Sequence, residues 1–445
     1  MKNKKRFILP VFVIAIIIAG FYNYPKLNII SGYAAKNMAS SVFIAHHSED
    51  YVNANDNDVP LIKLAASQVD NLKKQATSTV FGLMKRTAVY REGLGSVLIN
   101  GDYDPTDAHL KPNRAVRENK LDFPFGDGEA KDTVFSNIDY TQMQHALDQA
   151  FADPDSQKTR TVLVIYKDRI VAEKYIEGFS KETPILGWSM SKSILATLFG
   201  ILEYRQKIKI DGPAPVPSWQ NDDRKKITLN DLLRMQSGLA WDEDYTSISD
   251  VTQMLFLDTD MSKVQENKKA LAMPGKIWNY SSGTTNLLSG ILRRQFKSYQ
   301  DYLDFPYNAL IDKIGMHSML LETDLAGNFV GSSYGWADTR DWAKFGLLYL
   351  HKGNWQGEQL FDPQWVDYVT KPTAHSNGGY GAHFWLNYHG KFPDAPKDMF
   401  SANGYEGQYV FIIPSMDLVI VRTGLAEAPD FDANGFLKEV LLAIK

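Results

Sequence analysis

A serine and a lysine three residues apart open residues 187–200 (GWSMSKSILATLFG). If the apolar residues that follow form a helix, Ser189 lies in its first turn and Lys192 lies one turn further on the same face. A serine hydroxyl is a poor nucleophile at neutral pH unless a base lies within hydrogen-bond reach, and a lysine whose apolar neighbours disfavour its charged form can be that base. The N-terminus of such a helix also favours the negative charge that develops in acyl transfer. The pair therefore predicts a nucleophilic serine.

A second group of polar residues lies in residues 274–283 (PGKIWNYSSG). Tyr280 and Ser282 fall in an expected turn just before the apolar residues 287–292, which predict a helix. A tyrosine beside a lysine cation is held closer to ionisation and can pass a proton to a leaving group. Tyr280 is therefore a candidate for proton transfer.

A third stretch, residues 403–408 (NGYEGQ), is bracketed by glycines at the expected start of a strand. Glycines allow another backbone to approach closely, so a main-chain N–H here can face the same oxyanion as the N–H of Ser189. Each of the three stretches is weak alone, because Ser189 also fits a helix N-cap and Lys192 a solvated charge. Their order along the chain and their context together strengthen the interpretation.

The elements that must position these residues start at about Asn137. Residues 140–152 predict a helix. The apolar runs 161–166 and 170–175 predict a hairpin that leads into the nucleophile stretch.

The middle of the chain, to about Thr370, is mostly helical in pattern. Thr228 is the expected N-cap of one helix, with Asp231 three residues on, and Gly238 is its expected end. Residues 341–350 form a clear amphipathic run.

The last third of the chain returns to strands. Residues 408–413 and 418–423 flank a turn at 414–417, and residues 433–444 predict a final helix. Strands and a helix at both ends of residues 137–445, with helices between, predict one sheet assembled from the two ends and a helical insert.

The N-terminus differs from the rest of the chain. Four basic residues precede the uncharged apolar run 7–22, a pattern of export or membrane insertion; they are Lys2, Lys4, Lys5 and Arg6. We expect residues 1–25 to be an uncleaved membrane anchor, although the run is somewhat shorter than the ~20 residues of a comfortable span. A cleaved signal peptide is the alternative. Both place the bulk of the protein outside the cytoplasm, in the periplasm or at the cell surface.

Residues 26–136 carry no motif of chemical interest. Residues 77–83 and 87–90 predict short strands, and residues 105–128, rich in proline, glycine and charge, predict a loop. We expect this region to be an extension that packs on the main domain.

Composition excludes several classes of function. The chain has 445 residues, a formal net charge of −4 and a pI near 6.2. No block of like charge suggests a nucleic-acid surface, and the pI argues against one. It has no cysteine, which excludes disulfides, thiolate catalysis, Fe–S clusters and cysteine zinc sites. No H-E-x-x-H or other zinc spacing occurs, and we expect neither a metal nor an organic cofactor.

The chain resembles the serine hydrolases related to class C β-lactamases, especially the branch of esterases and 6-aminohexanoate-dimer hydrolase. Ser-x-x-Lys followed by two further motifs is typical of the penicillin-recognising serine enzymes. The resemblance runs in the family's order from about Asn137 to the C-terminus. It rests on WSMSKS (188–193), ITLNDLLRMQSGL (227–239), PGKIWNYSSGTTNLLSGIL (274–292), YGWADTRDWAKFGLLYL (334–350) and NGYEGQYVFIIP (403–414).

This resemblance implies an α+β fold of the β-lactamase/transpeptidase type, with an antiparallel sheet flanked by helices and a helical subdomain. It also implies a role for each matching residue. Ser189 is the acylated nucleophile, Lys192 its base and Tyr280 the proton shuttle. Ser282 is an accessory hydrogen-bonding residue, and the backbone N–H groups of Ser189 and Tyr405 form the oxyanion hole.

One departure from the family's pattern bears on the substrate. β-Lactamases and D,D-peptidases have Lys-Thr-Gly, or a histidine with the same function, as their third motif, and the cation helps to bind a substrate carboxylate. Here the matching residues are Ala402, Asn403 and Gly404, with no cation. An esterase or amide hydrolase is favoured, and a β-lactamase or D,D-peptidase is the alternative.

Two other classes of protein compete with this interpretation. Residues 187–191 come close to the G-x-S-x-G elbow of Ser-His-Asp hydrolases but lack the last glycine. Of the histidines after Ser189, none has a recognisable triad context, and we expect surface or packing roles for His375, His383 and His389. A non-catalytic binding module or sensor of the same fold usually lacks a catalytic residue, whereas here serine, lysine and tyrosine are all present.

Aromatic residues near the motifs predict an apolar pocket for an uncharged substrate. Trp188, Trp278 and Trp385 are the candidate pocket residues, and core packing is the alternative for each. A small ester, an amide and a short peptide all remain open as substrates.

Overall fold

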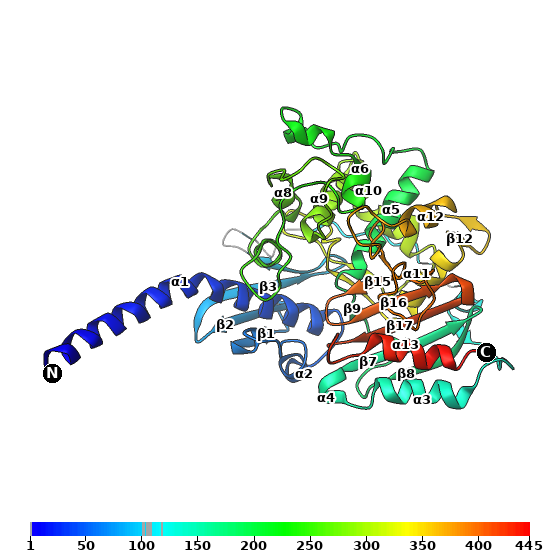
Figure 1. Ribbon diagram of the computed structural model, residues 1–445, viewed down its shortest axis with the longest axis horizontal. Coiled ribbons are helices and arrows are strands. Elements are labelled where there is room, and N and C mark those ends of the chain that lie inside the picture. The colour runs from blue at the N-terminus through cyan, green and yellow to red at the C-terminus, as the bar shows by residue number, and fades with distance from the viewer. Residues whose placement is uncertain (1, 100–102, 104–108, 117–118) are drawn as a thin grey trace. The chain divides into compact units, whose positions relative to one another are not determined.

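The computed structural model of the chain describes residues 2–99, 103, 109–116 and 119–445, apart from the side chains of residues 2–19 and 21–23. The chain forms two compact units (Figure 1). The N-terminal unit comprises Met1–Arg91, Ser96–Asp107 and Glu243–Thr259, and the main unit comprises Glu92–Gly95, Ala108–Asp242 and Asp260–Lys445. The three domains predicted from the sequence, 1–25, 26–136 and 137–445, stay predictions.

In the N-terminal unit a long helix, α1 (Lys2–Phe43), lies on a small sheet. The core between them contains many alanines, with Ala35 and Ala39 of α1 packed together with Ala76 and Ala88 of the sheet. Such small side chains let the helix lie close to the strands. The strands, in their spatial order, are β1 (Ala65–Asp70), β2 (Gln75–Val80), β3 (Leu83–Arg91) and β4 (Gly95–Ile99). The short helices α2 (Glu49–Ala54) and α7 (Asp250–Phe256) belong to the same unit.

The strand predicted at 77–83 covers the end of β2 and the turn that follows it, and the strand predicted at 87–90 lies within β3. Strands β1 and β4 were not predicted. Where the structure describes side chains, it contains no helix that is both long and apolar enough to cross a membrane. Nearly all of the apolar run 7–22 of the predicted anchor lies among residues whose side chains are outside the description.

The main unit is built on a six-stranded sheet in which all neighbouring strands are antiparallel. Two of its strands come from the N-terminal part of the region 137–445 and four from its C-terminal part, so the sheet is assembled from the two ends of this region, as the sequence predicted. In spatial order they are β14 (Trp385–Leu386), β15 (Phe400–Gly404), β16 (Gln408–Ile413), β17 (Leu418–Gly424), β7 (Thr159–Tyr166) and β8 (Arg169–Tyr175).

Helices cover both faces of this sheet. Because successive side chains of a strand point to opposite faces, β7 contributes Leu163 and Ile165 to one core and Val162 and Val164 to the other. The first core includes residues of α5 (Met190–Tyr204) and α11 (Thr339–Leu350), and the second those of α3 (Tyr140–Ala150) and α13 (Ala433–Leu442). The α+β sheet flanked by helices is therefore confirmed.

Short helices between Arg205 and Pro306 form the predicted helical part, around α9. They are α6 (Leu229–Leu233), α8 (Met261–Glu266), α9 (Ser282–Arg293) and α10 (Tyr299–Pro306). The remaining helices of the main unit are α4 (Pro154–Gln157) and α12 (Gln364–Thr370). Its small strands are β5 (Asp122–Phe123), β6 (Gly128–Ala130), β9 (Ile185–Leu186), β10 (Leu320–Leu321), β11 (Gly335–Ala337), β12 (Asn354–Trp355) and β13 (Glu358–Gln359).

One predicted helix end is wrong. Thr228 caps α6 through a capping box with Asp231, as expected, but α6 ends at Leu233 rather than near Gly238. Met235 has a left-handed φ of 57° that stops the helix. Gly238 has another reason to be glycine, because a Cβ there would lie 2.2 Å from the Ala272 carbonyl oxygen.

Candidate active site

Ser189 stands in a tight turn between β9 and α5. It occupies the N-cap position of α5, yet its side chain makes no capping hydrogen bond. The residue before it, Trp188, has a φ of 46°, a left-handed conformation that costs a non-glycine residue about 1–3 kcal/mol. Gly187 leaves no room for a side chain, since a Cβ would lie 2.2 Å from the ring of Trp342. The serine hydroxyl is therefore not used to cap the helix and is available for a contact with another side chain.

The amine of Lys192 lies beside that hydroxyl. Its Nζ is 2.9 Å from the Oγ of Ser189, 2.9 Å from the Oγ of Ser282 and 2.9 Å from the carbonyl oxygen of Ser332. The lysine side chain is almost fully buried, at 1% exposure, whereas Ser189 is partly exposed. Three neutral oxygens around the amine suit a neutral amine as well as an ammonium, so Nζ can take up the serine proton.

Ser282 reaches Lys192 because it begins helix α9. Ser281 caps that helix with a hydrogen bond from the Thr284 N–H, which leaves the Ser282 hydroxyl for the lysine. The sequence predicted Ser282 in a turn before the helix, whereas it is the first helical residue. Gly283 follows, and a Cβ there would lie 2.4 Å from the ring of Trp241, so this tryptophan packs on the first turn of α9.

Tyr280 brings its ring to the other side of the lysine. The ring centroid lies 4.9 Å from Lys192 Nζ, within the range of a cation–π contact. Tyr280 also packs in an aromatic cluster, with its ring 5.3 Å from Trp385 and 5.7 Å from Tyr380. Trp278 joins the cluster at 5.4 Å from Tyr380. Two of the three predicted pocket residues, Trp278 and Trp385, are thus partly exposed neighbours of Tyr280, and Tyr380 was missed.

The end of strand β15 lies against the nucleophile turn. A Cβ on Gly404 would lie 2.2 Å from the Gly187 carbonyl oxygen, so only a glycine permits this approach. The Tyr405 ring then packs edge-on against Trp188 at 5.5 Å. Burial raises the pKa of the Tyr405 phenol to about 12, so the side chain stays neutral near neutral pH. Trp188 is 5% exposed and contributes mainly to packing.

An oxyanion hole needs two backbone N–H groups that do not already donate to another group of the protein. Within the described part of the chain, the Ser189 N–H donates to no backbone carbonyl. The turn places it near the end of β15, where Tyr405 follows Gly404. The assignment of the Ser189 and Tyr405 N–H groups to an oxyanion hole stays a prediction.

The strand position that holds a cation in β-lactamases is filled by a methyl group here. Ala402 lies on β15, is 1% exposed and belongs to the same core as Leu195 and Leu198 of α5. Its neighbours are apolar, so this position provides neither a charge nor a hydrogen bond to a substrate carboxylate.

No histidine forms a triad with Ser189. His383 is buried, with its Nδ1 at 2.6 Å from the Leu233 carbonyl oxygen and its Nε2 at 3.0 Å from the Thr285 hydroxyl. Burial lowers the pKa of His383 to about 3, so it is neutral, and Nδ1 must carry the proton that it donates to the carbonyl. His375 and His389 are exposed. The surface and packing roles expected for these histidines agree with these positions.

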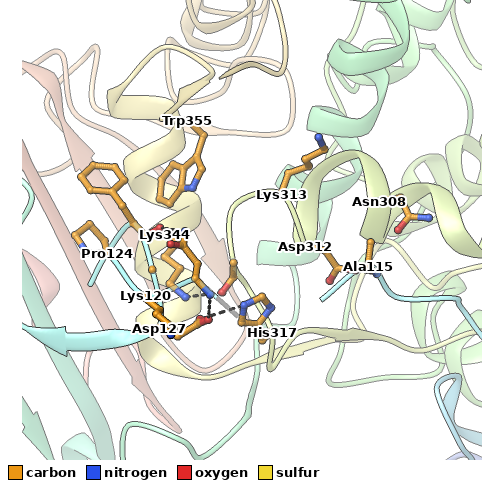
Figure 2. Close-up of a pocket in the computed structure, with 14 residues that line it drawn as sticks. Ala115, Lys120, Pro124, Asp127, Asn308, Asp312, Lys313, His317, Lys344 and Trp355 are labelled. Atoms are coloured by element: carbon orange, nitrogen blue, oxygen red, sulfur yellow. Dashed lines mark hydrogen bonds and ion pairs between the residues drawn. The ribbon is translucent and has the colours of Figure 1, made fainter. Parts of the chain in front are cut away.

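A cavity of about 620 Å³ lies elsewhere in the main unit (Figure 2). None of the predicted site residues lines it. Some of its polar groups are paired, as Asp127 is with His317 at 3.1 Å and Lys313 is with Glu358 at 2.9 Å. Its lining includes Lys120, Asp127, Asp312, Lys313, His317, Lys344 and Trp355.

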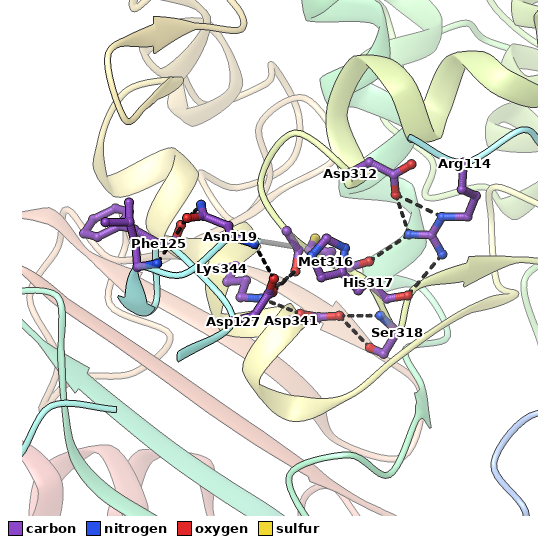
Figure 3. Close-up of polar contacts among 12 residues, drawn as sticks. Arg114, Asn119, Phe125, Asp127, Asp312, Met316, His317, Ser318, Asp341 and Lys344 are labelled. Atoms are coloured by element: carbon purple, nitrogen blue, oxygen red, sulfur yellow. Dashed lines mark hydrogen bonds and ion pairs between the residues drawn. The ribbon is translucent and has the colours of Figure 1, made fainter. Parts of the chain in front are cut away.

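Arg114 fixes one wall of this cavity (Figure 3). Its guanidinium Nε lies 2.9 Å from Asp312, and its other nitrogens donate to the carbonyls of Met316, His317 and Met319. The described residues contain no cluster of His, Asp and Glu that could hold a metal ion, here or near Ser189.

The structure therefore brings together Ser189, Lys192, Tyr280 and Ser282 from α5 and the start of α9. Sequence reasoning missed the Ser332 carbonyl, since any residue supplies a carbonyl and no side-chain pattern marks it. It also missed Tyr380, which only the folded chain places beside Tyr280.

Comparisons with known proteins agree with this arrangement. Residues 147–435, more than half of the chain, match the family model described as Beta-lactamase.

Three solved structures share the fold. A Bacillus anthracis protein assigned as a 6-aminohexanoate-dimer hydrolase is 19% identical, with a TM-score of 0.59 over 75% of this chain and 98% of that one. A D-stereospecific amidohydrolase from a Streptomyces species is 15% identical, with a TM-score of 0.51 over 69% and 98%. A family VIII carboxylesterase is 14% identical, with a TM-score of 0.50 over 71% and 99%. At these identities the likeness shows the fold alone.

Proposed function

The chain belongs to the Beta-lactamase family, and we propose that it is a serine hydrolase of this family that cleaves an ester or amide bond through an acyl-enzyme intermediate. One observation carries the proposal. The buried amine of Lys192 lies 2.9 Å from the partly exposed hydroxyl of Ser189 and is held there by Ser282 and the Ser332 carbonyl. A serine with a base at this distance can be deprotonated as it attacks.

In the proposed reaction, the Oγ of Ser189 attacks the substrate carbonyl carbon while its proton passes to Lys192 Nζ. The N–H groups of Ser189 and Tyr405 stabilise the oxyanion of the tetrahedral intermediate. When the intermediate collapses, the bond to the leaving group breaks and the leaving group takes a proton from Tyr280. The proton that Lys192 took from Ser189 then restores the Tyr280 phenol, so both groups return to their starting forms; Lys192 Nζ lies 4.9 Å from the centre of the Tyr280 ring. Water then attacks the acyl-enzyme by the reverse proton path and frees Ser189.

We propose an uncharged substrate. The buried methyl of Ala402 replaces the cation that a β-lactamase or D,D-peptidase uses for a substrate carboxylate. The aromatic rings of Trp278, Tyr380 and Trp385 lie around Tyr280 and favour an apolar acyl or leaving group. A small ester, an amide or a short peptide fits these features.

We also propose that the protein acts outside the cytoplasm and is anchored through residues 7–22. The support is the sequence, in which a basic segment precedes the apolar run. If the segment is cleaved instead, the protein is secreted.

Hydrolysis of short p-nitrophenyl esters and anilides, set against a chromogenic cephalosporin, tests the proposed reaction. We expect turnover of the ester or the anilide at a higher kcat/KM than the cephalosporin. Faster turnover of the cephalosporin would reverse the interpretation of Ala402. A burst of product with no steady state would instead indicate a binding module that is acylated without turnover.

A further inference from the structure

One end of the sheet in the N-terminal unit exposes large apolar side chains. Phe81 is 74% exposed, Leu61 52%, Leu83 47% and Leu64 45%. Apolar side chains exposed one at a time are common on soluble proteins, but a group of them marks a contact surface.

The strand register places three of these residues together, and Leu61 lies three residues before one of them, at the start of the 3-10 turn Ile62–Leu64. Ala65 of β1 lies opposite Val80 of β2, and Val80 lies opposite Leu83 of β3. Leu64 precedes Ala65 and Phe81 follows Val80, so both lie at the same end of the sheet as Leu83. We call Leu61, Leu64, Phe81 and Leu83 the apolar tip.

The backbone of the apolar tip is strained. Leu61 has a φ of 72°, Phe81 of 52° and the neighbouring Met84 of 49°. Left-handed conformations disfavour side chains of this size, and Gly82, with a φ of 74°, is the only one of the four that adopts such a φ without strain. Strain that presents apolar side chains to solvent is a feature of functional sites rather than of stability.

Helix α1 runs beside β3 in the same direction. Ser31 donates to the Met84 carbonyl at 2.6 Å, and the ring of Phe43 lies 5.9 Å from that of Tyr90. From Ser31 to Phe43 the helix rises about 18 Å, and from Met84 to Tyr90 the strand advances about 20 Å, so the two elements lie side by side over the same length.

The same geometry places the apolar tip at the level where α1 leaves the sheet. Phe81 and Gly82 form the two-residue turn between Val80 and Leu83. Phe81 therefore lies only about 6 Å beyond Met84 along the sheet, which corresponds to about four helical residues before Ser31 and thus to Leu27. Tyr24 is 45% exposed, whereas Ile29 and Ile30 are buried against the unit. Towards its N-terminus the helix continues past the strands (Figure 1), and this part of it contains the apolar run 7–22.

We infer that the apolar tip inserts into the lipid interface at the base of the anchor. This inference goes beyond the proposed reaction and rests on the proposed anchor. The partner is the headgroup and upper acyl region of a bilayer, where apolar and aromatic side chains are buried and lysines remain in contact with water. Lys63 and Lys85 flank the apolar tip and are exposed. Lys63 pairs with Asp58 at 3.4 Å, and Lys85 suits anionic lipid headgroups.

Spin-label depth measurements on the full chain test the inference. Because the chain has no cysteine, Phe81→Cys and Leu83→Cys each give a single nitroxide site. The labelled protein is reconstituted into phosphatidylcholine–phosphatidylglycerol vesicles and checked by flotation. We expect a label at either position to lose access to a water-soluble nickel chelate by about tenfold relative to the control, and to gain access to oxygen.

Leu72→Cys is the matched control, since Leu72 is 99% exposed in the turn between β1 and β2 at the other end of the sheet. Equal nickel access at all three positions in floating vesicles would overturn the inference and leave the anchor intact. Failure of the protein to float would overturn both. Spin–spin broadening at position 81 that persists in detergent would show a contact with a second copy, and would also overturn it. Ester hydrolysis by the same samples reports separately on the proposed reaction.

Discussion

Lys192 and Lys344 are both buried, but in different surroundings. Near the nucleophile, Lys192 lies among two serine hydroxyls and a backbone carbonyl. On α11, Lys344 forms an ion pair with Asp341 at 3.0 Å and donates to the Gly315 carbonyl. A carboxylate fixes a lysine in its charged form, whereas hydroxyls and a carbonyl serve the amine in both forms.

The same contrast holds for two histidines. His383, behind the nucleophile, is bonded to a carbonyl and a hydroxyl, and burial lowers its pKa to about 3. His351, at the end of α11, lies 2.7 Å from Asp168, and this hydrogen bond raises its pKa. The contacts named here for Lys192 and His383 are with neutral groups, whereas those of Lys344 and His351 include carboxylates. This contrast favours the proposed proton transfer in the first region and structural pairing in the second.

The largest expected effect comes from Lys192→Met. Loss of a general base costs about 10²–10⁴-fold in rate, so kcat/KM for a p-nitrophenyl ester should fall in this range. A methionine fills much of the space, so the melting temperature should change little. Retention of more than about a tenth of the activity would mean that Lys192 is not the base.

Lys344→Met should show the opposite pattern. It leaves Asp341 buried without its cation, which costs about 3–5 kcal/mol of unfolding free energy, while kcat per folded molecule stays unchanged. Denaturant unfolding and active-site titration separate the two quantities. The double variant Lys344→Met/Asp341→Asn should recover part of the stability, and no recovery would argue against a structural ion pair.

The lowered pKa of His383 predicts that the folded protein loses stability in acid. Its folded pKa of about 3 lies below the unfolded value, so the unfolded state binds a proton first as the pH falls below about 6.5, and each further pH unit costs about 1.4 kcal/mol. His383→Gln should flatten this part of the stability curve. Identical pH slopes for the two proteins between pH 4 and 6, the range set by these pKa values, would contradict the assignment.

Ser282→Ala should have a smaller effect than the loss of Lys192. It removes one of the hydrogen bonds that hold the amine, a loss of about 1–1.5 kcal/mol or about tenfold in kcat. Ser281→Ala, which removes the cap of α9, is the matched control and should lower stability more than kcat. Equal losses of kcat in the two variants would mean that Ser282 acts only through the helix.

The smallest effect is expected from the His351–Asp168 pair. The raised pKa of His351 means that its contribution is present below about pH 6.5 and is lost as the pH rises through the folded value. The pair is partly exposed, so it contributes less than about 1 kcal/mol. The pair should therefore make the melting temperature slightly higher below about pH 6.5 than above the folded pKa of His351. Asp168→Asn should remove this pH-dependent contribution, and a variant with the same pH dependence as the unmodified protein would contradict the prediction.

Local spacing made half of the candidate site predictable. Ser189 and Lys192 lie three residues apart, so one helix brings them together. The contact between Lys192 and Ser282 depends on the packing of α5 against α9, and the family's motif order supplied it where residue spacing did not. Nothing in the sequence marks the Ser332 carbonyl or the ring of Tyr380 as neighbours of the site.

The sheet of the main unit was also predictable, because β7, β16 and β17 are apolar runs with clear turns between them. The N-terminal unit was less so. Strand β1 (AASQVD) has little apolar alternation, since two of its six residues are exposed and none is fully buried. Residues 243–259 fold with the N-terminal unit although they lie between stretches of the main unit in the sequence. No pattern within these residues shows which unit they pack against, because that depends on contacts with residues far away in the sequence.

Labelling with a fluorophosphonate probe, followed by peptide mapping, tests the central assignment most directly. The label should lie on Ser189 in the unmodified protein, be absent from Ser189→Ala and be strongly reduced in Lys192→Met. Lys344→Met should be labelled as fully as the unmodified protein. Labelling of another serine, or no labelling of folded protein, would contradict the account.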